Sequence, residues 1–203
     1  MKTLTRSVIL GALVASSTAG LFVGAAAAAP ADSSADATST TSAKWVPKKL
    51  NFTFVGFTAH YSCDGLKGAL TSILKDLGAG KDLVVKSTGC VRFDGPEQFP
   101  GVNATFSVLE PAASAGKDAG NSPEVAARWD KVTLDADKPR QQIDGSCELI
   151  EQVKKSVLPL FSTRNVEFST DCFPHTQSLA GAKLSADVLK PVKPQGPEPA
   201  SGG

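Results

Sequence analysis

The chain is poor in the residues from which many active sites and metal sites are built. Among its 203 residues are two histidines, one tyrosine and one methionine. It contains no G-x-S-x-G nucleophile motif, no G-x-G-x-x-G motif, no phosphate-binding P-loop and no C-x-x-C redox pair. The sequence therefore offers no motif for the commonest hydrolase, nucleotide-binding or thiol-redox mechanisms, and we expect no cofactor.

Neither sign of charge is in excess. The chain carries 21 Lys and Arg residues against 20 Asp and Glu residues, a formal net charge of +1 at pH 7. Cleavage of the leader described next would remove Lys2 and Arg6 and leave 19 basic side chains against 20 acidic ones. A nearly neutral chain has no basic patch to attract nucleic acid or an anionic membrane surface. We therefore expect no nucleic-acid partner.

Residues 1–29 have the form of an export signal. Lys2 and Arg6 precede the apolar run SVILGALVASSTAGLFVG, and the following AAAAAP offers small-residue cleavage sites. SSTAG interrupts the run and no basic stop-transfer cluster follows it, which favours a cleaved signal peptide over a membrane-spanning helix. We expect a bacterial protein that is periplasmic or secreted, with no membrane insertion after cleavage.

Composition divides the remaining chain into three parts. Residues 30–43, PADSSADATSTTSA, contain no large apolar side chain and predict a disordered linker. Residues 191–203 are rich in proline and glycine and predict a disordered tail. The segment between them, 44–190, has the size of one ordinary domain.

This domain contains a weak internal repeat, with copies at about 45–93 and 129–175. A shift of 84 residues aligns the first part of each copy, and a shift of 82 aligns the last part. The aligned pairs include both tryptophans and all four cysteines: Trp45 with Trp129, Cys63 with Cys147, and Cys90 with Cys172. Because the same residue types recur in the same order, we interpret the pattern as a structural duplication.

Each copy has the pattern strand, helix, strand. In the first, Ser62 is a suitable N-cap, Gly78 is a natural helix end, and the apolar residues between them follow helical spacing. The expected helix stripes are Leu66, Ala69, Leu70, Ile73, Leu74 and Leu77 in the first copy, and Ile150, Val153, Val157, Leu158 and Phe161 in the second. Pro159 should kink the second helix or end it early.

The predicted fold class is α+β. Two strand-helix-strand units predict a ferredoxin-like antiparallel sheet with two helices on one face. The stretch GVNATFSVLEP, residues 101–111, predicts one extra strand that pairs with the strand before it. The strand WDKVTLDA, residues 129–136, has few apolar residues and is expected at a sheet edge.

The same topology predicts how the cysteines pair. When two parallel strands flank a helix, the start of the helix and the end of the second strand lie at the same end of the sheet. Cys63 and Cys147 open the two predicted helices, and Cys90 and Cys172 lie near the ends of the strands that follow. We therefore predict the disulfides Cys63–Cys90 and Cys147–Cys172, in keeping with an oxidising compartment.

A metal-binding protein is the first alternative. Both histidines lie three residues from a cysteine, so a site could combine His60, Cys63, Cys172 and His175. The spacing is a weak signal, because zinc sites usually show closely paired ligands. The predicted fold also separates Cys63 from Cys172, so disulfides are the favoured interpretation.

A small hydrolase is the second alternative. It would require His60 or His175 to meet a serine or a carboxylate in a cleft. The carboxylates near predicted helix starts and strand ends are Asp64, Asp94, Asp144, Glu148, Glu151 and Asp171. We interpret them as helix-terminal or solvated charges, so we assign no catalytic residue.

The most aromatic stretch is NFTFVGFTAHY, interpreted here as a strand with a bulge at Gly56. Phe52 and Phe54 would face one side of it, and Phe57 and Tyr61 the other. Aromatic residues exposed on the face away from the helices would be the best candidate for a binding surface.

Two stretches resemble exported bacterial proteins of unknown function: YSCDGLKGALTSILKDLGAGKDLVVKSTGC and CELIEQVKKSVLPLFSTRNVEF. The resemblance covers most of the domain and implies no activity or site residues. From the residues themselves we expect a non-catalytic, disulfide-stabilised binding or structural module, whose partner is an unknown protein or envelope component that it meets through its open sheet face.

Overall fold

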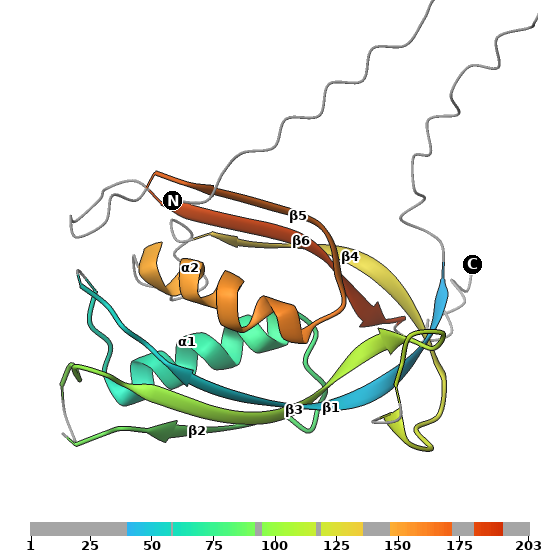
Figure 1. Cartoon of the computed structure of the whole chain (residues 1–203), viewed down its shortest axis with the longest axis horizontal. Helices are drawn as coiled ribbons and strands as arrows, with labels where there is room; N and C mark the ends of the chain where they lie inside the picture. Colours follow the sequence, from blue (N-terminus) through green and yellow to red (C-terminus); the bar gives the residue numbers. More distant parts are fainter. Residues whose placement is uncertain are drawn as a thin grey trace, which may run out of the picture. The chain divides into compact units, whose positions relative to one another are not determined.

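The computed structural model describes residues 40–57, 59–91, 95–116, 119–135, 147–171 and 181–192 (Figure 1). These residues form, in chain order, β1 (Thr41–Thr53), α1 (Cys63–Asp76), β2 (Val84–Thr88), β3 (Gly101–Pro111), β4 (Val125–Asp135), α2 (Cys147–Ser156), the 3₁₀ helix η2 (Leu158–Leu160), β5 (Thr163–Thr170) and β6 (Ala182–Pro191). The expected signal peptide and most of the expected linker and tail lie outside the described residues.

Within the described residues, six strands form one open antiparallel sheet in the order β2-β3-β1-β4-β6-β5. The predicted α+β class is confirmed at this level. β1 and β3 pair along almost their whole length, from Ala43 opposite Pro111 to Thr53 opposite Gly101. β1 and β4 pair only at their beginnings, through Thr41–Ala43 and Val125–Ala127. The sheet thus consists of two three-stranded halves joined at a short seam.

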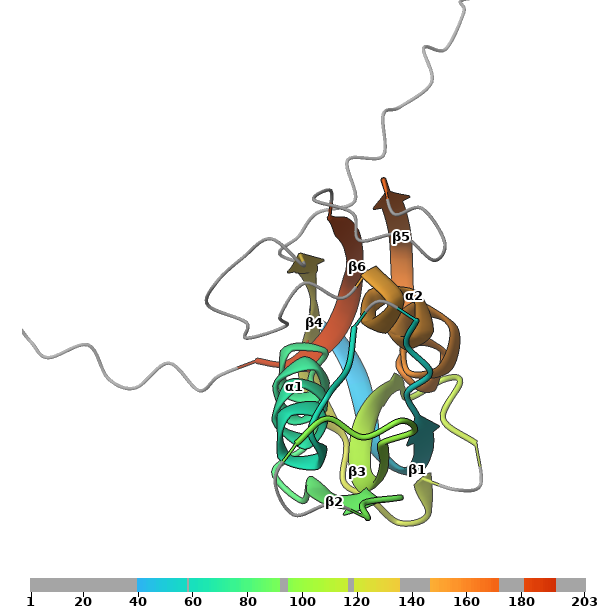
Figure 2. The same cartoon turned by 90° about the vertical axis from the view of Figure 1, so that its left-hand side faces the viewer.

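The two helices lie between these halves, as Figures 1 and 2 show from two directions. One hydrophobic core contains the inward-facing side chains of both halves and of both helices, among them Phe52, Phe106, Leu70, Ile150 and Leu184. Because one core serves the whole sheet, the two halves and the two helices make up a single packed unit.

The first helix forms where the sequence predicts it. Ser62 is its N-cap, and the Ser62 hydroxyl accepts a hydrogen bond from the Gly65 N–H at 3.1 Å. At the other end Gly78 has φ +94°, and the N–H groups of Gly78 and Ala79 donate to the carbonyls of Lys75 and Leu74. This is the Schellman arrangement that glycine favours. All six residues of the predicted stripe are buried.

The second helix also follows its predicted pattern. α2 ends at Ser156, and Pro159 lies in the short 3₁₀ helix that follows, because proline cannot continue an α-helix from this position. The predicted stripe residues are all buried, and Phe161 stacks on Phe106 with ring centroids 5.6 Å apart. This ring contact joins the second helical region to the first half of the sheet.

Several strand predictions need correction. The sequence predicts five strands, whereas residues Ala182–Pro191 form a sixth, β6. β6 covers the free side of β4, so β4 is a central strand and the expected edge position is wrong. β1 begins at Thr41, inside the predicted linker, and ends at Thr53, so NFTFVGFTAHY is not one strand. The predicted strand at 101–111 is confirmed as β3, paired with β2.

A second, smaller cluster lies at the seam between the halves, which we call the seam cluster. Its buried residues are Ala43, Leu109, Ala127 and Leu189, with Trp45, Val125 and Trp129 packed against them. Register places Trp45 opposite Leu109 and Trp129 opposite Leu189. In each of these strands the cluster residues alternate with those of the main core, so they lie on the opposite face.

Candidate functional site

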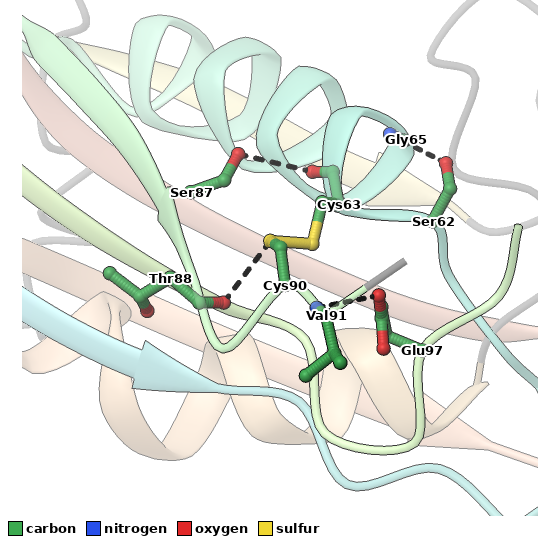
Figure 3. The surroundings of a disulfide bond; sticks show 8 residues. All are labelled: Ser62, Cys63, Gly65, Ser87, Thr88, Cys90, Val91 and Glu97. Carbon is green, nitrogen blue, oxygen red and sulfur yellow. Dashed lines mark hydrogen bonds between the residues drawn. A yellow bond between two sulfur atoms is a disulfide. The ribbon is translucent and has the colours of Figure 1, made fainter. Parts of the chain in front are cut away.

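Cys63 and Cys90 form a disulfide bond, with their Cα atoms 6.1 Å apart (Figure 3). Cys63 opens α1, and Cys90 follows the end of β2 by two residues. The pairing confirms the topological prediction for this bridge. The Ser87 hydroxyl also donates to the carbonyl of Cys63 at 3.5 Å, so the start of α1 is attached to β2 by a covalent and a polar link.

The second predicted bridge, Cys147–Cys172, stays a prediction because Cys172 lies outside the described residues. The structure does bear on the alternative metal site. The sulfur of Cys63 is bonded to Cys90, so it provides no thiolate for a metal. Of the other proposed ligands, His60 is exposed, and His175 lies outside the described residues. No cluster of three metal-ligating side chains occurs among the described residues.

The disulfide lies at the end of the sheet where β1 stops and β3 begins. We call this region the loop end and define it as residues 54–57, 59–61, 89–91 and 95–100. The Phe54 N–H donates to the carbonyl of Pro100 at 2.9 Å, which continues the β1–β3 pairing by one step. The two loops that leave these strands are therefore held next to each other.

Side chains of α2 hold the first of these loops. The Gln152 side chain accepts from the Val55 N–H at 3.1 Å and donates to the Val55 carbonyl at 2.9 Å. The Glu148 carboxylate accepts from the N–H groups of Phe57, at 3.0 Å, and Ala59, at 3.3 Å. These contacts supply the hydrogen bonds that a neighbouring strand would supply, so the loop is ordered without belonging to the sheet.

Glu97 holds the second loop. The residue is 7% exposed. Its carboxylate accepts from the Val91 N–H at 2.9 Å, and its own N–H donates to the carbonyl of Tyr61 at 3.0 Å. Figure 3 shows Glu97 and Val91 beside the disulfide. Together these bonds tie the segment after Cys90 to the segment before Cys63.

The loop end carries large apolar side chains that face solvent. Phe57 is 65% exposed, Phe99 53% and Val91 85%. Val91 and Phe99 border a hollow of about 580 Å³, whose other lining residues are His60, Gly89, Pro96, Glu97 and Gln98. Folding normally buries such residues, since full burial of one phenylalanine contributes about 1.5–3 kcal/mol. Among the described residues the other exposed large apolar side chains outside this region are valines, Val84, Val166 and Val192, so the exposed phenylalanines distinguish the loop end.

The aromatic stretch divides differently from the expectation. Phe52 and Phe54 are buried in the core as predicted, but Tyr61 is buried as well and meets Phe54 edge-to-face at 4.9 Å. Only Phe57 of this set is exposed. The helix-free face of β1 and β3 carries the exposed polar residues Lys49, Asn51, Asn103 and Thr105. The aromatic residue on this face of the two strands is Trp45, which is half-buried in the seam cluster, so Phe57 and Tyr61 do not form the expected aromatic face on the sheet.

The carboxylates also differ in role. Asp64 and Glu151 are exposed, as expected for helix-terminal and solvated charges. Glu148 is not a solvated charge, because it binds two backbone N–H groups of the loop end. Asp171 is exposed at the end of β5, and Asp94 and Asp144 lie outside the described residues. His60 makes no hydrogen bond or ion pair within the described residues, so the hydrolase alternative finds no catalytic partner for it there.

The sequence reasoning missed Gln152 and Glu97. Glutamine and glutamate are common on exposed helices and loops. Nothing in the sequence therefore indicates that these two side chains bind backbone groups of the loop end. Gly56 could have been a signal: a Cβ at this position would meet the Ala59 carbonyl oxygen and come within 2.5 Å of the Phe54 ring. Only glycine fits the close turn that brings the loop back toward α2.

Comparison with models of protein families, with curated proteins and with solved structures found no match for this chain. Among the described residues no helix combines the length and apolar character that a membrane crossing requires.

Proposed function

We propose that the protein is an exported, non-catalytic binding module that recognises another protein through the loop end. The observation that carries the proposal is the exposure of Phe57, Phe99 and Val91 on a backbone held by a disulfide and by three side chains, those of Glu148, Gln152 and Glu97. The export signal and the predicted second disulfide are consistent with a compartment in which such a module would act.

Exposed aromatic side chains on an ordered backbone favour a protein as the partner. Binding energy at protein interfaces is concentrated in a few anchors, and aromatic residues are enriched among them. An anchor already held in position loses little conformational freedom on binding. The polar groups beside the aromatics, His60 and Gln98 at the rim of the hollow, suit the polar surroundings that such anchors usually have.

The proposal moves the binding surface from the open sheet face to the loop end. Toward the loop end, the face of β1 and β3 that lies away from the helices carries exposed polar residues and resembles an ordinary solvated surface. The apolar groups that a partner could cover lie at the end of these strands instead.

We also propose that the domain arose by duplication of a β-α-β-β unit. β1 and β4 begin 84 residues apart, as do α1 and α2, and the strand order is the same when read outward from the seam. Each half is a split β-α-β unit, with β3 between β1 and β2, and β6 between β4 and β5. The ferredoxin-like arrangement is built on the same unit, so the likeness applies to each half separately.

Site-specific cross-linking tests the binding proposal. A photoreactive phenylalanine analogue replaces Phe57 or Phe99 in one set of variants, and replaces Asn103 or Thr105 on the sheet face in the matched control set. Each purified protein is irradiated with the extracytoplasmic fraction of its source organism. We expect both loop-end positions to label the same protein and both control positions to label none.

A second variant separates recognition from accidental labelling. Phe57→Ala, introduced into the protein that carries the cross-linker at position 99, should reduce labelling about fivefold or more, since loss of one anchor typically costs more than 1 kcal/mol. Labelling from the sheet face alone, or no adduct from any position, would refute the loop end as the binding surface.

A further inference from the structure

A second hollow, of about 840 Å³, lies near the beginning of β1, far from the loop end. Its lining comes from Trp45 of β1, the last turn of α1 and the turn after it, Ser107 of β3, and the end of β6. From Trp45 to Thr53, where the loop end begins, β1 runs eight residues, or about 26 Å of extended strand. The two regions are therefore separate surfaces of the domain. The volume is typical of a site for a small molecule.

The turn after α1 contributes two glycines, Gly78 and Gly80, to the lining of this hollow. Gly78 has φ +94°, and Gly80 donates its N–H to the carbonyl of Ser107 at 2.8 Å. A Cβ at Gly80 would lie 2.6 Å from the Asp82 carboxylate and 3.3 Å from the ring of Trp45. The glycines let the backbone approach the indole closely, and Trp45, which is half-buried, forms an aromatic wall of the hollow.

Three lysines line the hollow: Lys75 from the last turn of α1, Lys81 from the turn, and Lys190 from β6. None of the three has a carboxylate within salt-bridge distance among the described residues, where the ion pairs involve Lys44, Lys48, Arg128, Lys131 and Arg164. Like charges gathered around one concave space repel one another unless an anion lies between them.

The one carboxylate in the lining, that of Asp82, offsets only part of the positive charge, because the lining holds three lysines. Both Asp82 oxygens are engaged by Ser107, one by its N–H at 3.2 Å and the other by its hydroxyl at 2.7 Å. Asp82 therefore fastens the turn to β3, and three lysines against one carboxylate leave the lining with an excess of positive charge.

We propose that this hollow binds a small anion with a flat apolar body. The body would stack on Trp45 and the glycine backbone, and a carboxylate or phosphate group would meet the three ammonium groups. Nothing in the proposal depends on the loop end, so this is a second binding site of the domain. Trp45 and Trp129 occupy aligned positions of the sequence repeat, but only Trp45 would bind the ligand. The Trp129 ring is instead covered by Arg164, whose guanidinium carbon lies 4.7 Å from the ring centroid.

Three probes with the same ring system test the proposal: 2-naphthoate, 2-naphthyl phosphate and the neutral 2-naphthamide. Binding to the full domain is followed by NMR, through the indole N–H resonance of Trp45 and the amide resonances of residues 78–82. We expect at least one anion to bind at least about fivefold more tightly than the amide, and to shift these resonances but not the Trp129 indole. The two anions distinguish a carboxylate ligand from a phosphate ligand.

Charge-removing variants provide the matched control. Lys75→Gln, Lys81→Gln and Lys190→Gln combined should weaken binding of the anion about tenfold and leave binding of the amide unchanged, because each exposed ion pair contributes a few-fold at most. The control combines Lys49→Gln, Lys86→Gln and Lys183→Gln, at three exposed lysines on strands away from the hollow. It should change neither the affinity for the anion nor the affinity for the amide. Equal affinity for the amide and both anions, or an unchanged anion affinity in the first triple variant, would overturn the proposal.

Discussion

The side-chain amide of Gln152 pairs with the backbone of Val55, accepting from its N–H at 3.1 Å and donating to its carbonyl at 2.9 Å. The two residues are 97 positions apart in the sequence, one on α2 and one just after β1. Gln152 thus makes the two hydrogen bonds that a neighbouring strand would make with the backbone just after β1. It attaches a loop of the first half of the sheet to the helix of the second half.

Gln152→Ala should remove both hydrogen bonds and destabilise the protein by about 1–2 kcal/mol, because two backbone groups lose their partners. Glu151→Ala on the exposed face of the same helix is the control and should change the free energy of unfolding by less than about 0.5 kcal/mol. Urea unfolding followed by circular dichroism measures both. Equal effects for the two variants would show that the Gln152 contacts do not contribute to stability.

Gly56→Ala and Gly68→Ala should have opposite effects. A Cβ at Gly56 would collide with the Ala59 carbonyl oxygen and the Phe54 ring. A Cβ at Gly68, on the exposed face of α1, would meet nothing within 4 Å. We expect Gly56→Ala to cost about 1–3 kcal/mol, as overpacking does. Gly68→Ala should gain about 0.5–1 kcal/mol from helix propensity. Thermal unfolding of both variants checks the signs, and a stable Gly56→Ala protein would mean that the loop can adopt another path.

Removal of the Cys63–Cys90 bridge by the double variant Cys63→Ser and Cys90→Ser should cost about 3 kcal/mol, since the bond closes a loop with a sequence separation of 27 residues. The loss should be greatest at the loop end, because α1 would be tied to β2 there by the Ser87 hydrogen bond alone. Amide hydrogen exchange should therefore accelerate first at Val91 and Glu97. Uniform acceleration over the whole domain would show that the bridge stabilises the fold but does not hold the loop end in particular.

The predicted bond between Cys147 and Cys172 can be examined by peptide mapping without reduction, with thiols counted on the same sample. We expect one peptide pair that joins Cys63 to Cys90, a second that joins Cys147 to Cys172, and no free thiol. Free or metal-protected thiols at Cys147 and Cys172 would refute the second bridge, and the duplication would then lose its aligned disulfides.

The beginning of β1 should respond to acid through Glu124. The Ser42 hydroxyl donates to this carboxylate at 2.6 Å and Lys44 lies 3.7 Å from it, and these partners lower the pKa of Glu124 below its ordinary value of 4.5. A depressed pKa stabilises the folded protein above pH 4.5, and this contribution is lost as the pH falls through the folded-state pKa. Glu124→Gln should therefore make stability less dependent on pH below about 5. A pH profile identical to that of the unmodified protein would exclude this contribution.

Local patterns in the sequence determined the first helix and the first disulfide. The cap at Ser62 and the apolar stripe that ends before Gly78 depend on residues close together in the chain. The first disulfide followed from the strand-helix-strand order of one copy, and the structure agrees with each. Pro159 likewise determined where the second helix stops, because its effect is confined to one turn.

Only the tertiary structure decided how the two halves meet. β6 alternates the apolar Ala182, Leu184, Ala186 and Val188 with polar residues, as a strand does, but the two-copy interpretation assigns no element between the second copy and the predicted tail. Its place beside β4 depends on long-range pairing, which no local pattern shows. The central position of β4 followed from β6. The roles of Glu148, Gln152 and Glu97, and the gathering of Lys75, Lys81 and Lys190 beside Trp45, depend on which surfaces face each other after folding. Hydrogen bonds and charge clusters between residues tens of positions apart have no period along the chain, so packing alone determines them.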